Sequence, residues 1–277
     1  MNISFIGGKK RARAYYQYFC ERAGFKIMGF YCNPIKDCAD IAISSNTCLF
    51  TCIDDLCNAS DIIFICTEDE MLPHVINTMT KLHINNKIII SPARQIMPND
   101  LDNGYNNTLI VFDSPVTLEH LNADEIPDAN IVMCGQGKDY DKFLECAKNS
   151  GMSVFNITKP ELKLFRAANH LLYHGINAVV TSASKLCKIC SGVTVNPVPV
   201  IKNVLSNTNC DTDFYKMGYS TEIADIIDVL NNNGIESITN LVRAVGIVET
   251  ENANLEKDVA YDMLKVLSTG TKGGFKI

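Results

Sequence analysis

The sequence predicts an α/β protein: an N-terminal domain built on a parallel sheet, residues 1–158, and an all-helical C-terminal domain, residues 159–277. Three observations carry this prediction. Short apolar runs alternate with helical segments in the first half, which is typical of a parallel sheet covered by helices on both faces. A glycine-rich stretch joins the first apolar run to the first helical segment. Strand-like runs stop after about residue 158, and only helical patterns follow.

The main strands of the first domain are expected at five apolar runs: residues 3–6, 26–31, 62–66, 87–90 and 109–112. Between them, residues 10–22 carry Tyr15, Tyr18 and Phe19 at helical spacing. Residues 69–82 begin with acidic side chains, which suit a helix N-terminus. Both segments are expected to be crossover helices of the sheet.

A weaker set of elements would extend the same sheet, with strands at residues 129–134 and 152–157 and a helix at 138–149. From Pro160 to Cys190 the sequence predicts one long, mostly apolar helix, since proline suits an early helix position. Further helices are expected at residues 213–217, 221–231, 235–245 and 254–267.

The composition narrows the class of protein. A chain of 277 residues, 47% of them hydrophobic, can bury a large core, so a globular enzyme or binding protein is expected. Its net charge of −6 argues against a nucleic-acid-binding surface, which would be basic. The start lacks the pattern of a secretory signal, and no apolar stretch approaches the roughly 20 residues of a membrane span. We expect a cytoplasmic protein with neither a membrane nor a nucleic-acid partner.

The twelve cysteines are expected to be reduced thiols, because disulfide scaffolds are typical of much shorter secreted chains. Cys187 and Cys190 form a lone Cys-x-x-Cys pair, and a zinc site would need two further ligands at suitable spacing. Cys48, Cys52 and Cys57 have no histidine near them in sequence. We therefore expect no metal site.

The stretch between the first strand and the first helix is a candidate phosphate loop. Unpaired backbone N–H groups at such a helix start bind a pyrophosphate, as in a Rossmann-type dinucleotide site. Gly7 would make the tight turn, and the small Ala12 would let helix and strand pack closely. Lys9 stands where a second glycine is usual, so its side chain either reaches a phosphate or obstructs it. The expected cofactor contacts in this loop are Gly7, Gly8, Lys9, Lys10, Arg11 and Ala12.

The end of the second strand bears on the choice of cofactor. An acid at this position holds the ribose 2′-hydroxyl of NAD, and Cys32 and Asn33 provide none. Lys10, Arg11 and Lys36 would instead be available for a 2′-phosphate. NADP is therefore favoured over NAD, with Asn33 among the cofactor contacts. The alternative is a solvated basic helix start that binds no nucleotide.

With this loop, the run at residues 61–69 and the long helix from Pro160, the chain resembles a family of Rossmann-like oxidoreductases with a helical C-terminal domain of unknown function. These proteins are related to pyrroline-5-carboxylate reductase, ketopantoate reductase and the 6-phosphogluconate-dehydrogenase-like enzymes. The resemblance implies a nicotinamide cofactor that is bordered by Cys66 and Thr67 and, after the next strand, by Ser91.

The same resemblance implies a catalytic position after the strand at residues 109–112. A His-Pro pair of the family becomes Ser114-Pro115 here, so the proline is kept and the imidazole is absent. A Tyr-His pair at the start of the long helix becomes Phe165-Arg166. These departures favour an alternative reading, in which the chain has lost catalysis but still binds a ligand.

The predicted long helix carries a polar stripe at spacings of three and four: Arg166, His170, Tyr173, His174 and Asn177, with Asn169 beside them. In the related enzymes this helix faces the nicotinamide end of the cleft. His170 or His174 would act as a general acid, since imidazole titrates near neutral pH. Arg166 would clamp a substrate carboxylate by two hydrogen bonds. The alternative is a solvated face at a domain or dimer boundary.

These residues define the predicted function, an NADP-dependent oxidoreductase that transfers hydride to or from a small carboxylated metabolite in the interdomain cleft. The candidate catalytic residues are His170, His174, Arg166 and Ser114, and the candidate substrate contacts are Asn169, Tyr173 and Asn177. A homodimer through the helical domain is expected, because its apolar helices need a partner to bury them. The competing hypothesis is a catalytically lapsed Rossmann protein that binds a nucleotide or metabolite as a sensor or assembly subunit.

Overall fold

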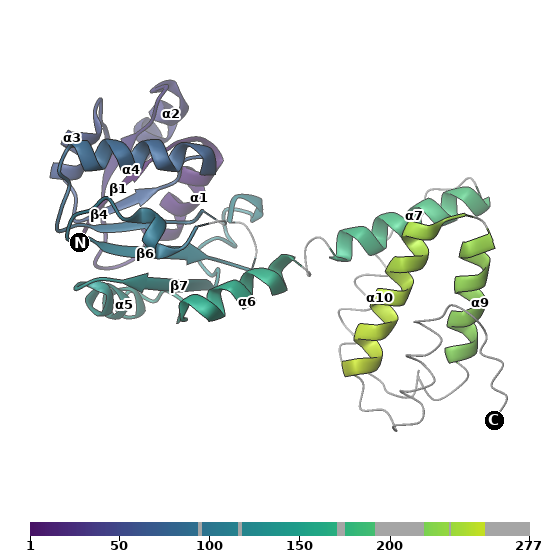
Figure 1. Ribbon diagram of the computed structural model, residues 1–277. Coiled ribbons are helices and arrows are strands. Elements are labelled where there is room, and N and C mark those ends of the chain that lie inside the picture. The colour runs from purple at the N-terminus through teal and green to yellow at the C-terminus, as the bar shows by residue number, and fades with distance from the viewer. Residues whose placement is uncertain (94–95, 116–117, 171–174, 192–218, 233, 253–277) are drawn as a thin grey trace. The chain divides into compact units, whose positions relative to one another are not determined.

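A computed structural model of the 277-residue chain describes residues 1–93, 96–115, 118–170, 175–191, 219–232 and 234–252. The chain divides into two compact units, Met1–His170 and Leu171–Ile277 (Figure 1). The sequence analysis places its domain boundary near residue 158, whereas here Lys159–His170 belongs to the first unit. That helix buries Leu162 in the first unit's core, which accounts for its place there.

An eight-stranded sheet in the order β3-β2-β1-β4-β5-β6-β7-β8 forms the first unit. Its strands are β1 Asn2–Ile6, β2 Lys26–Tyr31, β3 Cys48–Leu49, β4 Ile62–Ile65, β5 Ile88–Ser91, β6 Thr108–Asp113, β7 Ile131–Gln136 and β8 Val154–Asn156. Strands β1 to β6 are mutually parallel, which confirms the predicted Rossmann-type sheet.

Strand β7 pairs antiparallel with β6, and β8 pairs parallel with β7. The two strands extend the sheet as predicted, but they run against the other six. A parallel pair needs a crossover connection, usually an α-helix. Between β6 and β7 the described residues form only the single-turn 3₁₀ helix η3, Leu118–His120. The described part of this 17-residue connection therefore contains no crossover α-helix, in keeping with the antiparallel pairing of β6 and β7.

Helices cover both faces of this sheet (Figure 1). One face packs against α1, α2 and α5, and the other against α3, α4 and α6. Their bounds are α1 Lys9–Cys20, α2 Lys36–Ser44, α3 Ile53–Asn58, α4 Leu72–Lys81, α5 Tyr140–Asn149 and α6 Lys159–His170. Single 3₁₀ turns at η1, Asp69–Met71, and η2, Pro98–Leu101, complete the unit.

The two faces draw on alternate residues of each strand. In β4, Ile62 and Phe64 enter the core under α1, while Ile63 and Ile65 enter the core under α3 and α4. All four side chains are buried. A strand buried on both faces reads in sequence as a continuous apolar run, and such a run made the central strands predictable.

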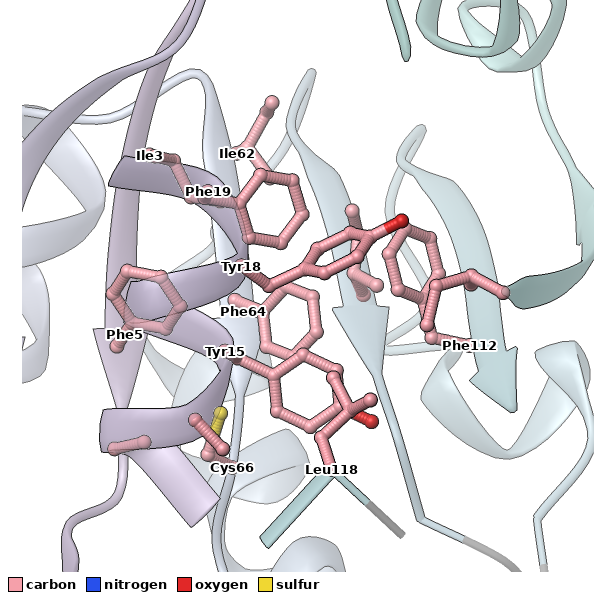
Figure 2. Packing of buried hydrophobic residues seen from close by; sticks show 14 of the residues in the cluster. Ile3, Phe5, Tyr15, Tyr18, Phe19, Ile62, Phe64, Cys66, Phe112 and Leu118 are labelled. Atoms are coloured by element: carbon pink, nitrogen blue, oxygen red, sulfur yellow. The ribbon is translucent and has the colours of Figure 1, made fainter. Parts of the chain in front are cut away.

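An aromatic cluster fills the core under α1 (Figure 2). Phe19 is its centre: its ring centroid lies 5.6 Å from that of Phe64, 6.2 Å from that of Phe112 and 5.3 Å from that of Phe25. Tyr15 lies nearer the loop after β4, with its ring centroid 4.7 Å from that of Phe64. These contacts join α1 to strands β4 and β6.

The second unit contains α7 Ile176–Ser191, α9 Tyr219–Asn232 and α10 Glu236–Asn252. Helices α9 and α10 confirm the predictions for residues 221–231 and 235–245. The predicted long helix from Pro160 appears as α6 and α7, and residues 171–174 between them lie outside the described residues. The predicted helices at 213–217 and 254–267 also lie outside them. No helix in the described ranges is long and apolar enough to cross a membrane.

Phe19→Ala should lower the free energy of unfolding of the first unit by about 3–5 kcal/mol, because it opens a cavity among fully buried rings. Urea denaturation measures this loss. Ile43→Ala is the control, since Ile43 lies on α2 with 78% of its surface exposed and should change stability little. Equal losses for the two variants would contradict the packing described for Phe19.

Candidate functional site

The loop between β1 and α1 requires glycine at two consecutive positions. Gly7 has a φ of +116°, and a Cβ there would lie 2.6 Å from the carbonyl carbon of Cys66. A Cβ on Gly8 would lie 2.7 Å from the carbonyl oxygen of Asp37. The Gly7 backbone N–H donates to the carbonyl oxygen of Tyr31 at 2.8 Å. The loop is thus held against the ends of β2 and β4 by close backbone packing.

The N-terminus of helix α1 has no side-chain cap. Gly8 occupies the N-cap position, no side chain caps the first turn, and no acidic residue lies in that turn. The first N–H groups of a helix have no partner within the helix, and the positive end of its dipole favours an anion. Lys10 is exposed there, whereas the side chain of Lys9 lies outside the described residues. Ala12 is fully buried, so it packs against the sheet as predicted for a small residue.

The C-terminal ends of β1 and β4 meet at the switch point of the sheet, where the strand order reverses direction. Ligands of open α/β sheets bind at this position. Thr67 lies two residues after β4, and its buried Oγ1 has no hydrogen-bond partner. Cys66 is buried beside it, and burial raises the pKa of its thiol well above the usual value. Thr67 therefore presents an unsatisfied polar atom at the place where a ligand is expected.

Arg11, in the first turn of α1, is engaged by three partners. Its Nε donates to Glu119 at 2.9 Å, and its Nη1 donates to the Thr67 carbonyl oxygen at 2.6 Å and to Asp69 at 3.1 Å. Burial lowers the pKa of Arg11, but the hydrogen bonds and charges of Glu119 and Asp69 outweigh it, so the net pKa is raised. The side chain thus joins α1 to η1 and η3. Among the described cations proposed for a 2′-phosphate, Lys10 and Lys36 are exposed.

A disulfide joins Cys32, directly after β2, to Cys38 in α2, with their Cα atoms 6.1 Å apart. This corrects the expectation of reduced thiols for this pair, because the turn after β2 brings together two cysteines six positions apart. Asn33 lies exposed within the closed segment. The described cysteines that stay free are Cys20, Cys48, Cys52, Cys57, Cys66, Cys134 and Cys146.

The two serines expected at the site are buried. Ser91 Oγ donates to the Ile65 carbonyl oxygen at 3.1 Å and accepts the Ala93 N–H, so its hydroxyl joins the ends of β4 and β5. Ser114 follows β6, and its backbone N–H donates to Asp113 at 2.9 Å. Its carbonyl oxygen accepts from Asn169 of α6 at 3.3 Å. Both serines therefore help to hold the ends of strands and helices together.

Arg166 of α6 is clamped to the same edge of the sheet. Its Nε donates to Asp113 at 2.8 Å, and Nη1 and Nη2 donate to the backbone carbonyl oxygens of Ile96 at 2.6 Å and Ala93 at 3.2 Å. The Asp113 side chain is 6% exposed and that of Arg166 is 19% exposed. Most of the guanidinium N–H donors therefore bond to acceptors within the protein. Few remain for the substrate carboxylate that the sequence analysis expects Arg166 to bind.

Sequence reasoning missed Asp113, although an acid directly after a predicted strand is a signal that could have found it. The structure brings together Arg166, Asn169, Asp113 and Ser114. His170 is exposed on the last turn of α6. Tyr173 and His174 lie outside the described residues, as does the side chain of Asn177.

Within the described ranges, no group of three or more His, Cys, Asp or Glu side chains is placed to hold a metal ion. The side chains of Cys187 and Cys190 lie outside those ranges.

Comparison with solved structures identifies the fold. A protein from Bacteroides fragilis named as an NADP oxidoreductase matches with a TM-score of 0.63 at 14% identity, over 88% of this chain and 95% of that chain. The chain has the fold of this oxidoreductase. A reductive aminase from Aspergillus terreus, in complex with NADPH and ethyl levulinate, has a TM-score of 0.57 at 13% identity, over 96% and 92% of the two chains. The 1-pyrroline-5-carboxylate reductase of Streptococcus pyogenes has a TM-score of 0.52 at 16% identity, over 98% of each. These matches confirm a Rossmann-type sheet combined with helices after it.

No protein-family model matches the sequence, and no curated protein matches it. The matches to solved structures therefore identify the fold of this chain.

Arg166→Ala should lower the free energy of unfolding of the first unit by about 3–5 kcal/mol, because it leaves the buried carboxylate of Asp113 unpaired. The double variant Arg166→Ala, Asp113→Ala should lose less than the sum of the two single variants, as a urea-denaturation cycle would show. Leu164→Ala is the control on the same helix, since Leu164 is 70% exposed. If Arg166→Ala left stability unchanged, the clamp would be wrong and the guanidinium would be free to bind a ligand.

Proposed function

We propose that the protein is an NADP-dependent oxidoreductase that transfers hydride to or from a small molecule at the C-terminal edge of the sheet. The observation that carries this proposal is the loop at Gly7 and Gly8, which lies at the switch point of the strand order. Fold alone would not support it, because one scaffold hosts many reactions. The proposal therefore depends on the geometry of this loop and its neighbours.

The residues at this edge fit the pyrophosphate of a dinucleotide. A Cβ at Gly7 or Gly8 would clash with the backbone of Cys66 or Asp37, so only glycine lets the loop pack this closely at the switch point. Helix α1 has an uncapped start with no acidic residue in its first turn. The unpartnered Oγ1 of Thr67 could donate to a bound oxygen. An anion at this edge would accept hydrogen bonds from the helix start and from the Thr67 hydroxyl.

NADP is supported over NAD by the end of β2. An acid there would hold the ribose 2′-hydroxyl of NAD, whereas this chain has Cys32 in a disulfide and the exposed amide of Asn33. Lys10 and Lys36 are exposed and would bind a 2′-phosphate. The Aspergillus terreus reductive aminase of the same fold binds NADPH, whereas a variant imine reductase from Myxococcus stipitatus binds NAD+.

When bound, NADP would supply or accept the hydride, and the chain's own residues would position the substrate and move the proton. Arg166 and Asp113 fix α6 against the ends of β5 and β6. This contact sets the place of His170, which we assign as the proton donor, with His174 as the second candidate. The side-chain amide of Asn169 donates one hydrogen bond to the Ser114 carbonyl oxygen, and its remaining donor and acceptor would contact the substrate. Arg166 would act by positioning α6, and a carboxylate on the substrate would need a different cation.

NADPH should bind the purified protein, and Gly8→Val should weaken that binding by roughly tenfold or more. The added side chain would lie against Asp37 and would displace the loop from the phosphates. Nicotinamide fluorescence measures both affinities, and NADH serves as the comparison cofactor. Ile43→Val is the control, because it also places a valine in the first unit but at a position with 78% of its surface exposed.

The outcomes separate the two functional classes. Failure of the wild-type protein to bind either nucleotide would overturn the oxidoreductase proposal. Binding without turnover of any carbonyl or imine substrate would favour the lapsed sensor or assembly subunit. Unchanged binding by Gly8→Val would place the phosphates elsewhere.

We also propose that the helical unit forms a homodimer. Large apolar side chains are exposed on its described helices, namely Val179 and Ile189 of α7 and Ile226 of α9. Exposed apolar surface of this kind is typical of a protein–protein interface. Light scattering should give twice the chain's mass of 30.6 kDa, and Ile189→Lys should shift the protein toward a monomer. A monomeric mass for the wild-type protein would contradict the proposal.

A further inference from the structure

The Cys32–Cys38 disulfide closes a short ring at the end of β2, where the proposed function places the adenosine ribose and its 2′-phosphate. The ring contains Asn33 and Lys36, both exposed. The disulfide is shielded: Cys38 is 0% exposed and Cys32 is 5% exposed. Among the described residues it is the one disulfide. Its position, rather than its presence alone, points to a link with ligand binding.

The ring touches the phosphate loop at both of its ends. Tyr31, directly before Cys32, accepts the Gly7 N–H at 2.8 Å. Asp37, directly before Cys38, lies so close to Gly8 that its carbonyl oxygen would contact an added Cβ at 2.7 Å. A movement of the ring therefore reaches both glycines of the loop.

Reduction of the disulfide must move this ring. Two thiols cannot stay at bonding distance, because non-bonded heavy atoms settle at about 3.5–4.0 Å. Cys38 lies in a close-packed core beside Ile41 and Ala42 of α2, so its sulfur has little room on that side. Both sulfurs lie near the Ile35 carbonyl oxygen, at 3.5 and 3.7 Å, which would accept from the new S–H groups. The exposed residues 33–36, the turn after β2 and the first residue of α2, are the part of the ring that can yield.

We propose that Cys32 and Cys38 form a thiol redox site that sets the affinity of the protein for NADP, with the disulfide as the tight-binding form. This inference rests on the proposed function. The closed ring holds Asn33 and Lys36 in place before the cofactor arrives, which saves the entropy of ordering them on binding. In the reduced protein these residues must be ordered when the cofactor binds, and the packing of Asp37 against Gly8 becomes looser.

The chemical step is a thiol–disulfide exchange with a dithiol as the reductant. A thiolate of the dithiol attacks Sγ of Cys32, the less buried of the two residues, and the Cys32–Cys38 bond breaks. Cys38 leaves as a thiolate and takes up a proton. The second thiol of the reductant then displaces Cys32, and the reductant becomes a cyclic disulfide. Two electrons and two protons pass to the protein. In a cytoplasmic protein, as the sequence predicts here, disulfides are usually transient and redox-sensing.

Linkage makes the effect reciprocal. If the disulfide form binds NADP more tightly, NADP must favour the disulfide over the dithiol by the same factor. Bound cofactor would also cover Cys32, so reduction should become slower as well as less favourable.

The experiment compares NADPH affinity of the oxidised full-length protein with that of the protein reduced by dithiothreitol, with alkylation and mass spectrometry to count free thiols. Reduction should weaken binding at least about fivefold, the lower end of usual coupling between sites. Cys32→Ser, Cys38→Ser should bind as the reduced protein does and should ignore dithiothreitol. Cys20→Ser, which removes an exposed free thiol of α1, should keep the full response. Circular dichroism verifies that the reduced protein stays folded.

A second measurement keeps the test decisive if the double variant does not fold. NADPH should shift the dithiothreitol concentration needed for half-reduction of the wild-type disulfide upward by the same factor. Equal affinity of the oxidised and reduced forms, or free Cys32 and Cys38 in the oxidised protein, would overturn this inference and leave the proposed function standing. Absence of NADPH binding in both forms would instead overturn the proposed function.

Discussion

A sheet that is buried on both faces can meet a ligand only at its edges, and this constraint governs the first unit. Helices cover each face, and the side chains of β4 are all buried. Polar groups that do chemistry must therefore lie at the ends of strands or on helix residues that are close to those ends. The observed polar network obeys this rule, since Thr67, Asp113 and Arg11 all lie where a strand ends or a helix begins. The glycine loop lies at the same edge, packed against the backbone of Cys66 and Asp37.

The fold was largely predictable from the sequence because apolar runs are local signals. Residues 62–65 are apolar at every position, and residues 26–31 were predicted at their observed bounds. Helices α2 and α3 were not predicted, since they span nine and six residues and carry little periodic signal. The direction of β7 was also missed. Strand direction depends on the connection between strands, and apolar alternation is the same in both directions.

The candidate site was predictable in outline but not in its contacts. The loop at Gly7 is contiguous in sequence, so its glycines and its setting could be read together. Arg11 and Glu119 are 108 residues apart, and Arg166 and Asp113 are 53 apart. Sequence reasoning therefore counted both arginines as free for ligands, whereas the fold pairs them internally. The disulfide was missed for a different reason. Composition and chain length indicate only whether a protein is expected to contain disulfides, whereas the turn after β2 brings Cys32 to Cys38.

The reversal at β7 decides which end of α6 meets the switch-point edge of the sheet. Because β7 and β8 run against the other strands, β8 ends at the far edge of the sheet, and α6 starts there. Lys159 accordingly bonds Gln136, at the end of β7, whereas Arg166 bonds Asp113, at the opposite end of β6. The helix thus travels back across the sheet and delivers Asn169 and His170 to the switch-point edge. Had the last two strands kept the common direction, the same helix would have carried its imidazole away from the switch-point edge. The two inverted edge strands therefore decide at which edge of the sheet the helix that follows them ends.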